Sequence, residues 1–431
     1  MLGTPFLTLL DPNAKIKGSR DPLGLQPIWT HFGRRVVRNL TTVTTSVRGF
    51  TTLLLGLYFA ERMVEDHDAD AGRYADLFLQ FEQLAAYSRV ACSTDPEQYE
   101  EDEIRGIQRV KKNLASRKII ISARQENQIL ANQKTYGLWG LYSVAARNSG
   151  WLENNSPRLT PIARDFVEAE YLARLGRDGQ PVIRLLNADS VFEPHGKHQQ
   201  VAQNLAQILG KRLTLSETEF YGKHLLACGS DGLQLALWKQ IERAGFTDGF
   251  SMSELREVIK RSRVSGNLDL TERLEAIQYI ELAIGPMARL FSFLLSQNQQ
   301  PIAQVVTAVR STWGLRLKHI DVGAFSAALN SACDKLGNET CTRLQRAAVA
   351  LGDGRYQDVV GALLEQNVAV MRARGGGSWL NVNGSDLEVH YREEAAPLPA
   401  RDELSGLWTN SYFINALKAI GQQIYAQGGP V

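Results

Sequence analysis

The part of the chain that decides the local fold is residues 125–175, which read QENQILANQKTYGLWGLYSVAARNSGWLENNSPRLTPIARDFVEAEYLARL. Apolar residues at helical spacing predict one helix from Gln125 to Lys134 and a second from Leu138 to Arg147, separated by a turn at Tyr136-Gly137. The second helix is expected to bury its apolar stripe. Its opposite face then carries the small residues Gly140 and Ser143 and the long cationic residue Arg147.

The residues after this second helix predict a short hairpin and a third helix. Asn148-Ser149-Gly150 ends the helix, and Trp151-Leu152 and Arg158-Leu159 flank a turn, which is a hairpin pattern. Thr160 followed by Pro161 is typical of a helix start. The expected inward-facing residues of that helix are Ile162, Phe166, Val167 and Tyr171.

Outward from this stretch, the sequence predicts a mainly α protein of several helical units. We expect an N-terminal helical region over 1–104, a separate domain over 105–180, a helical domain over 181–374 and a hairpin with a terminal helix over 375–431. The hairpin prediction rests on Asn383-Gly384, a preferred tight turn, between two β-rich runs at 379–382 and 387–391.

Composition places the chain in the ordinary globular class. Its 431 residues are 44% hydrophobic and 22% charged, which argues against long disordered regions. A formal net charge of +2 creates no general attraction for polyanions, so any contact with nucleic acid requires a local basic patch.

The four cysteines, Cys92, Cys228, Cys333 and Cys341, form no C-x-x-C pair, so the sequence predicts reduced thiols rather than a zinc ribbon or a disulfide framework. The longest largely apolar stretch, Gly49 to Ala60, is too short to span a bilayer, and the first residues do not resemble a secretory signal. We therefore expect a cytoplasmic protein without membrane contact.

Metal and catalytic signals in the sequence are weak. Glu193, His195 and His198 are close together, but Pro194 and Gly196 place them in a loop without an identifiable fourth ligand. The sequence contains no P-loop, no G-x-S-x-G elbow and no H-E-x-x-H helix. We assign no catalytic residue, cofactor or metal, and expect a non-enzymatic protein.

The order of elements over about Gln125 to Arg174 resembles the winged helix-turn-helix superfamily of DNA-binding proteins. The resemblance rests on a helix, a G-W-L strand start, a short wing and an R-L-T-P helix start. It implies that Leu138 to Arg147 is the recognition helix and that Asn154 to Arg158 is the wing. The chain as a whole also resembles uncharacterised bacterial proteins of antiviral defence loci, through stretches near its start, middle and end.

Two main functional hypotheses follow, and a divergent metal-dependent enzyme, with acidic residues brought together from distant segments, is a third interpretation. In the first, the chain is a DNA-binding or scaffolding subunit of a bacterial anti-phage system, which holds double-stranded DNA through phosphate contacts and a helix in a groove. In the second, it is a helical adaptor for a partner nuclease or ATPase, with exposed aromatic anchors such as Trp379, Trp408 and Tyr412. The residues expected to contact DNA are Arg34, Arg35, Arg38, Lys111, Lys112, Arg124, Lys134, Ser143, Arg147 and Arg158. The basic run after residue 104 also fits a solvated helix with internal ion pairs.

Overall fold

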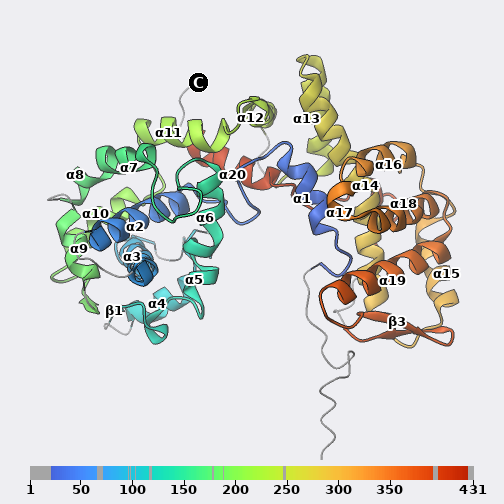
Figure 1. The fold of residues 1–431 in the computed structure, drawn as a ribbon, viewed down its shortest axis with the longest axis horizontal. Coiled ribbons are helices and arrows are strands. Elements are labelled where there is room, and N and C mark those ends of the chain that lie inside the picture. The colour runs from blue at the N-terminus through green and yellow to red at the C-terminus, as the bar shows by residue number, and fades with distance from the viewer. Residues whose placement is uncertain are drawn as a thin grey trace, which may run out of the picture. The chain divides into compact units, whose positions relative to one another are not determined.

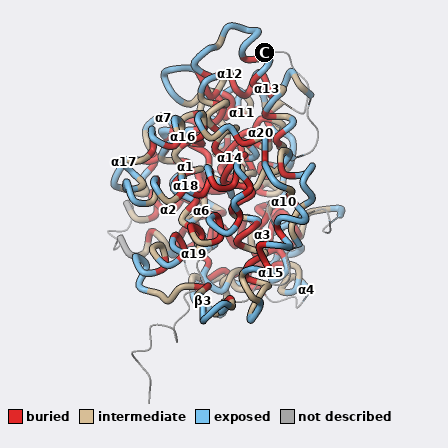
Figure 2. Tube along the Cα trace, turned by 90° about the vertical axis from the view of Figure 1, so that its right-hand side faces the viewer, coloured by how far each residue is buried: buried red, intermediate tan, exposed pale blue. Residues whose placement is uncertain are grey.

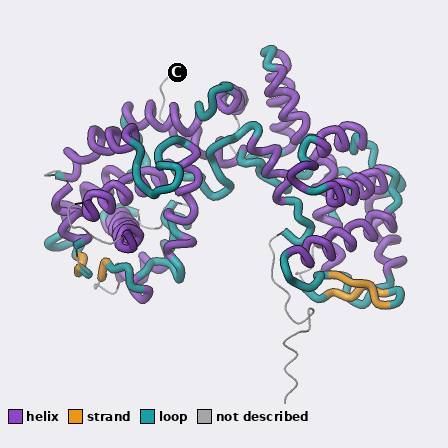
Figure 3. The backbone as a smooth tube through the Cα atoms, in the orientation of Figure 1, coloured by secondary structure: helices purple, strands orange, loops and turns teal. Residues whose placement is uncertain are grey.

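The computed structural model describes residues 21–65, 71–95, 97, 99–101, 103–115, 119–176, 179–187, 189–245, 249–391 and 397–425. The described chain is mainly helical, as the sequence predicted, and its strands form two small antiparallel sheets (Figures 1 and 3). It divides into two compact units. Unit 1 contains the described residues up to Val36 and from Ala244 to Tyr412, and unit 2 those from Val37 to Arg243 and from Phe413 onward.

Unit 2 is built around two long helices that pack against each other, α2 (Val47–Glu65) and α3 (Ala71–Ala91). Phe59 and Phe81 stack between them at 5.6 Å, and Gly56 gives the room, because a Cβ there would lie 2.9 Å from the Phe78 ring. The remaining helices are α4 (Ile107–Ala115), α5 (Gln133–Tyr136), α6 (Leu138–Asn148), α7 (Pro161–Val167), α8 (Ala173–Leu175), α9 (Gln180–Leu186), α10 (Gln199–Ile208), α11 (Leu215–Tyr221), α12 (Leu233–Ala244) and α20 (Ile414–Tyr425). Strand β1 (Ile119–Ile121) pairs with β2 (Ser190–Phe192).

A buried ion pair links α2 to α11 inside unit 2. Arg48 meets the carboxylate of Glu217, and both side chains are at most 5% exposed. The remaining guanidinium protons go to the carbonyls of Gly210 and Arg212 at 2.6 Å, and the Tyr171 hydroxyl donates to Glu217 at 2.7 Å. Because these further bonds satisfy both charges, the pair can be buried without an unpaired group.

Unit 1 is built around the 28-residue helix α14 (Leu268–Leu295), most of which is buried (Figure 2). Its Glu281 is inaccessible and receives hydrogen bonds from Thr409, Asn410 and Tyr412, including 2.8 Å from the Tyr412 hydroxyl. The surrounding helices are α1 (Gln26–Arg34), α13 (Met252–Val264), α15 (Ile302–Trp313), α16 (Val322–Asn330), α17 (Cys333–Leu336), α18 (Asn338–Gly352) and α19 (Tyr356–Ala373).

The predicted C-terminal hairpin is confirmed. Strand β3 (Leu380–Asn383) pairs with β4 (Asp386–Val389). The turn lies one residue later than the Asn-Gly signal predicted: Asn383 pairs with Asp386, and Gly384-Ser385 forms the two-residue turn, with φ +64° at Gly384. The terminal helix α20 follows. The hairpin belongs to unit 1 and α20 to unit 2, so this sequence region contributes to both units.

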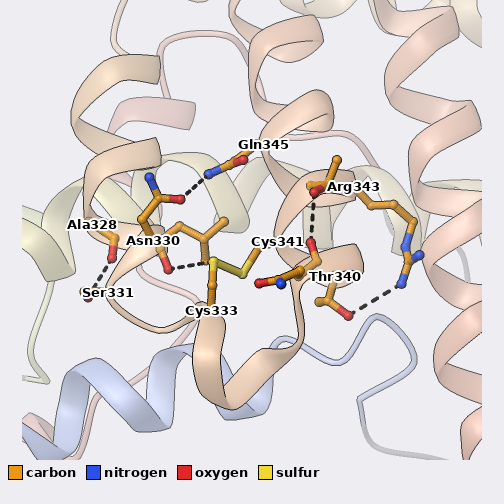
Figure 4. Close-up of a disulfide and its surroundings, with 11 residues drawn as sticks. Ala328, Asn330, Ser331, Cys333, Thr340, Cys341, Arg343 and Gln345 are labelled. Carbon is orange, nitrogen blue, oxygen red and sulfur yellow. Dashed lines mark hydrogen bonds between the residues drawn. A yellow bond between two sulfur atoms is a disulfide. The ribbon is translucent and has the colours of Figure 1, made fainter.

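The expectation of four reduced thiols is wrong. Cys333 and Cys341, at the start of α17 and in the first turn of α18, form a disulfide (Figure 4). The pair lies eight residues apart, which no C-x-x-C search detects. Cys92 and Cys228 are free.

None of the helices in the described ranges is at once long and apolar enough to cross a bilayer.

Candidate functional site

Helix α6 is the predicted recognition helix, and its observed range, Leu138–Asn148, confirms the predicted position within one residue. It begins where it does because a buried carboxylate receives its first amide. Glu82 on α3 accepts 2.7 Å from the Leu138 N–H and 2.8 Å from the Gln133 amide. A Cβ on Gly137 would lie 2.7 Å from that carboxylate, so only glycine fits at this turn.

Glu82 is an ionisable group held inside the unit. Burial is the largest influence and raises its pKa to about 7, while the hydrogen bonds from Leu138 and Gln133 and the charge of Arg105 act in the opposite direction. The negative form also faces the N-terminus of α6, where the helix dipole favours an anion. The α6 start therefore depends on a carboxylate that titrates near neutral pH.

The inner face of α6 packs against α2. Tyr142 is 2% exposed, and its hydroxyl accepts 3.2 Å from the Ser46 amide. Its ring meets Phe50 edge to face at 4.9 Å, and it also fills the space beside Gly49, where a Cβ would clash at 2.6 Å. These contacts fix the rotation of α6 about its axis.

The outer face of α6 is open to solvent in unit 2. Gly140 and Val144 are exposed, the latter by 50%, while Ser143 and Arg147 are half-buried. The spacing of these residues places them on one side of the helix. The Ser143 hydroxyl donates back to the Trp139 carbonyl at 2.6 Å.

The small size of Gly140 has a structural cause that the sequence did not reveal. A Cβ at this position would lie 2.1 Å from the Thr135 carbonyl oxygen, at the junction of α5 and α6. Glycine is therefore required by packing. This packing alone accounts for the glycine.

The predicted hairpin after α6 is shorter than expected. It consists of one bridge, Leu152 to Leu159, around an exposed turn at 153–157. Arg147 secures the turn from α6, since its guanidinium donates to the carbonyls of Glu153 (3.1 Å) and Ser156 (3.4 Å). The α6 face and this turn, residues 140–158, thus form one surface, which we call the α6–turn surface.

The prediction of a first helix over Gln125 to Lys134 is wrong. Residues 125–134 do not form a continuous helix; a 3-10 turn covers Gln125–Asn127 and α5 covers only Gln133–Tyr136. Hydrogen bonds of the Gln133 side chain replace the helix. Its Oε1 atom accepts from the Ile129 backbone amide at 3.2 Å, and its Nε2 atom donates to the Leu79 carbonyl on α3 at 2.9 Å. Tertiary hydrogen bonding overrides helical spacing here.

The third helix begins at Pro161 with Thr160 as its cap residue, as predicted. Phe166 and Val167 are buried, but Ile162 is 44% exposed, so its expected inward position is wrong. The π-helical segment Glu168–Leu172 continues this helix.

Three of the predicted phosphate contacts are engaged by carboxylates. Arg38 pairs with Asp231, Lys111 with Glu97 at 2.6 Å and Arg124 with Asp189 at 3.0 Å. This is the pattern of a solvated surface with internal ion pairs, the alternative considered for the basic run. These cations are poorly placed to neutralise phosphates.

The other seven predicted contacts are divided between the two units. Arg34 and Arg35 belong to unit 1, and burial lowers the pKa of Arg34. Lys112, Lys134 and Arg158 are exposed in unit 2. Of the ten predicted contacts, Lys134, Ser143, Arg147 and Arg158 are on α5, on α6 or in the turn that follows, so these four are close in the local structure.

The aromatic anchors expected for an adaptor are mostly internal. Trp379 is 2% exposed and Tyr412 is inaccessible, while Trp408 is half-buried against Phe250 at 5.5 Å. They stabilise unit 1 and cannot serve as exposed anchors in this arrangement.

Within the described ranges, no group of three or more histidine, cysteine or acidic side chains could hold a metal ion. At the loop considered from the sequence, the His198 Nδ1 atom instead accepts 3.1 Å from the Glu193 amide. That bond orders the loop before α10.

Comparisons with known protein families, with curated proteins and with solved structures find no match for this chain.

Proposed function

We propose that this chain is a non-enzymatic binding subunit, in which the α6–turn surface of unit 2 takes up a macromolecular partner. The supporting observation is that this surface is open across the length of α6 while the helix is rigidly held from behind. Glu82 fixes its start, Tyr142 fixes its rotation and Arg147 fixes the turn. A rigid, open helix face is the geometry that binding sites on helices require.

The partner that this surface fits best is a protein. Val144 lies at its centre and is 50% exposed, and Tyr136 beside the helix start is 56% exposed. Such residues favour contact with an apolar protein surface. In the context of the resemblance to defence-locus proteins, the candidate partners are a nuclease or an ATPase of the same system.

Double-stranded DNA is the second candidate. It is favoured by the three cations Lys134, Arg147 and Arg158, which come from α5, α6 and the following turn. Three cations are few for phosphate binding, since specific DNA-binding proteins commonly make about 6–10 such contacts. The structure therefore supports the adaptor more strongly than the DNA-binding subunit.

One set of variants separates the two candidates. Co-purification with the products of neighbouring genes, after nuclease treatment, is expected to be lost in Val144→Asp and retained in Lys134→Ala and Arg158→Ala. DNA binding would instead be weakened by Lys134→Ala and Arg158→Ala, and each lost cation would lower the slope of affinity against salt by about 1. Lys239→Ala, at an exposed lysine on α12 outside the expected DNA contacts, is the matched control.

The proposal fails if Val144→Asp retains the complex and no variant of the surface changes DNA binding at low salt. Circular dichroism and thermal melting of each variant establish that the fold is intact.

A further inference from the structure

A groove of about 490 Å³ lies between α19 and β3 in unit 1. Helix α19 lines one side with Val368 and Arg372, and β3 lines the other with Leu380 and Val382. Val368 is 42% exposed and Val382 is 46% exposed, so the groove has apolar walls that solvent reaches. A helix and a strand edge with a channel between them is the arrangement into which extended peptides dock in several recognition domains.

The outer edge of β3 is available for pairing at Val382. On the other strand, the amide and carbonyl of Leu387 point away from β3, to the Gln300 carbonyl at 3.0 Å and the Gln299 amide at 2.8 Å. Leu387 is the register partner of Val382. Directly opposed residues in an antiparallel ladder share the same hydrogen-bonding class, so the Val382 amide and carbonyl also point outward.

The two edges of the hairpin therefore differ. Residues 299–302 cover β4 through the bonds above and through a bridge between Pro301 and Asp386. No backbone partner for Val382 outside the hairpin occurs among residues 21–425 as far as they are described. An uncovered strand edge is a template for pairing with another chain.

The charges of the groove specify the occupant further. Glu365 pairs with Arg346, and Arg343 donates to Gln366 at 2.8 Å and to Glu339. Arg372 has no carboxylate within ion-pair distance among the residues that the structure describes. After internal pairing, the groove is left with one cation, which complements a carboxylate.

We propose that this groove binds an extended segment of a partner protein, which pairs with β3 at Val382. An aliphatic side chain of the segment rests on Val368, and an acidic side chain meets Arg372. The site lies in unit 1 and uses none of the α6–turn surface, so it stands whether or not the proposed function of unit 2 holds.

The test uses the full chain and a fluorescent probe peptide of about seven residues, the usual length of a strand, in which valine and threonine alternate around one glutamate. Fluorescence anisotropy measures its affinity. Val368→Asp and Arg372→Glu are each expected to weaken binding about tenfold or more. Val349→Asp, on a valine of α18 that is 38% exposed and outside the groove, is the matched control and is expected to leave binding unchanged.

Two further peptides test main-chain pairing directly. Each is N-methylated at every second residue, and the methylated positions of the two peptides are shifted by one residue. One peptide therefore lacks the N–H groups that face β3, and the other lacks those that face solvent. We expect one peptide to bind about tenfold more weakly and the other to bind like the parent. The proposal is overturned if the parent peptide does not bind, or if the two N-methylated peptides bind equally. It is also overturned if Val368→Asp binds the parent peptide as tightly as the wild type does.

Discussion

Replacing Glu82 with glutamine tests whether the start of α6 depends on a buried titrating carboxylate. The folded protein raises the pKa of Glu82 from 4.5 to about 7. A raised acid pKa means that the folded state holds the proton over a range in which the unfolded state has lost it. The free energy of unfolding therefore falls as pH rises from about 4.5 to about 7.

The magnitude follows from the shift. At about 1.4 kcal/mol for each pKa unit, this group lowers the stability of unit 2 by about 3 kcal/mol between those two pH values. Glutamine keeps an oxygen for the Leu138 amide and cannot ionise. Glu82→Gln should therefore gain stability relative to the wild type as pH rises, and the difference should level off above about pH 7.

The assay is the urea dependence of hydrogen exchange, read by mass spectrometry in peptides from α3 and α6 at several pH values from about 5 to 8. Reading peptides isolates unit 2, which a single global transition would not do for a chain with two compact units. Glu126→Gln, at an exposed position in the 3-10 turn, controls for the loss of one negative charge. A stability difference between Glu82→Gln and the wild type that stays constant with pH would refute the reasoning.

Three further predictions concern stability and covalent state. Gly140→Ala should destabilise unit 2 by about 1–3 kcal/mol, because the added methyl group would lie 2.1 Å from the Thr135 carbonyl oxygen. Gly361→Ala in α19 should stabilise unit 1 by about 0.5–1 kcal/mol, because a Cβ there would meet no atom of another segment within 4 Å. Urea unfolding of the two variants compares these effects. Alkylation of the denatured, unreduced chain should label only Cys92 and Cys228, and labelling of all four thiols would contradict the disulfide. Glu281→Gln should cost unit 1 about 2–4 kcal/mol, since its amide nitrogen would face hydrogen-bond donors; unchanged urea unfolding would contradict this role.

Local signals in the sequence predicted the second helix, its end and the third helix start. Gly150 adopts φ +78°, as a helix-terminating glycine does, and Pro161 occupies the first turn of α7. The end of α6 and the start of α7 depend on neighbouring residues only. The hairpin over 380–389 was predictable for the same reason, although its turn is Gly384-Ser385 and not Asn383-Gly384.

The features that the sequence did not reveal depend on residues far apart in the chain. Glu82 lies 56 positions before the amide that it holds, and the Gln133 side chain reaches back 54 positions to Leu79. The sequence shows Glu82 only as one polar residue in an amphipathic helix. The signal available was its position between Phe81 and Leu84, inside an apolar run where a carboxylate needs a partner.

This separation of local and distant causes also determines which substitutions can report on function. A change at Gly137 or Gly140 would disturb α5, α6 and the Glu82 carboxylate through packing, so a loss of binding there would say nothing about the partner. Val144 and Arg158 are both exposed in unit 2. An aspartate at Val144 weakens contact with an apolar protein surface and also repels a duplex, whereas the loss of the Arg158 cation weakens a duplex alone. The pair Val144→Asp and Arg158→Ala is therefore the shortest route from this surface to the class of its partner.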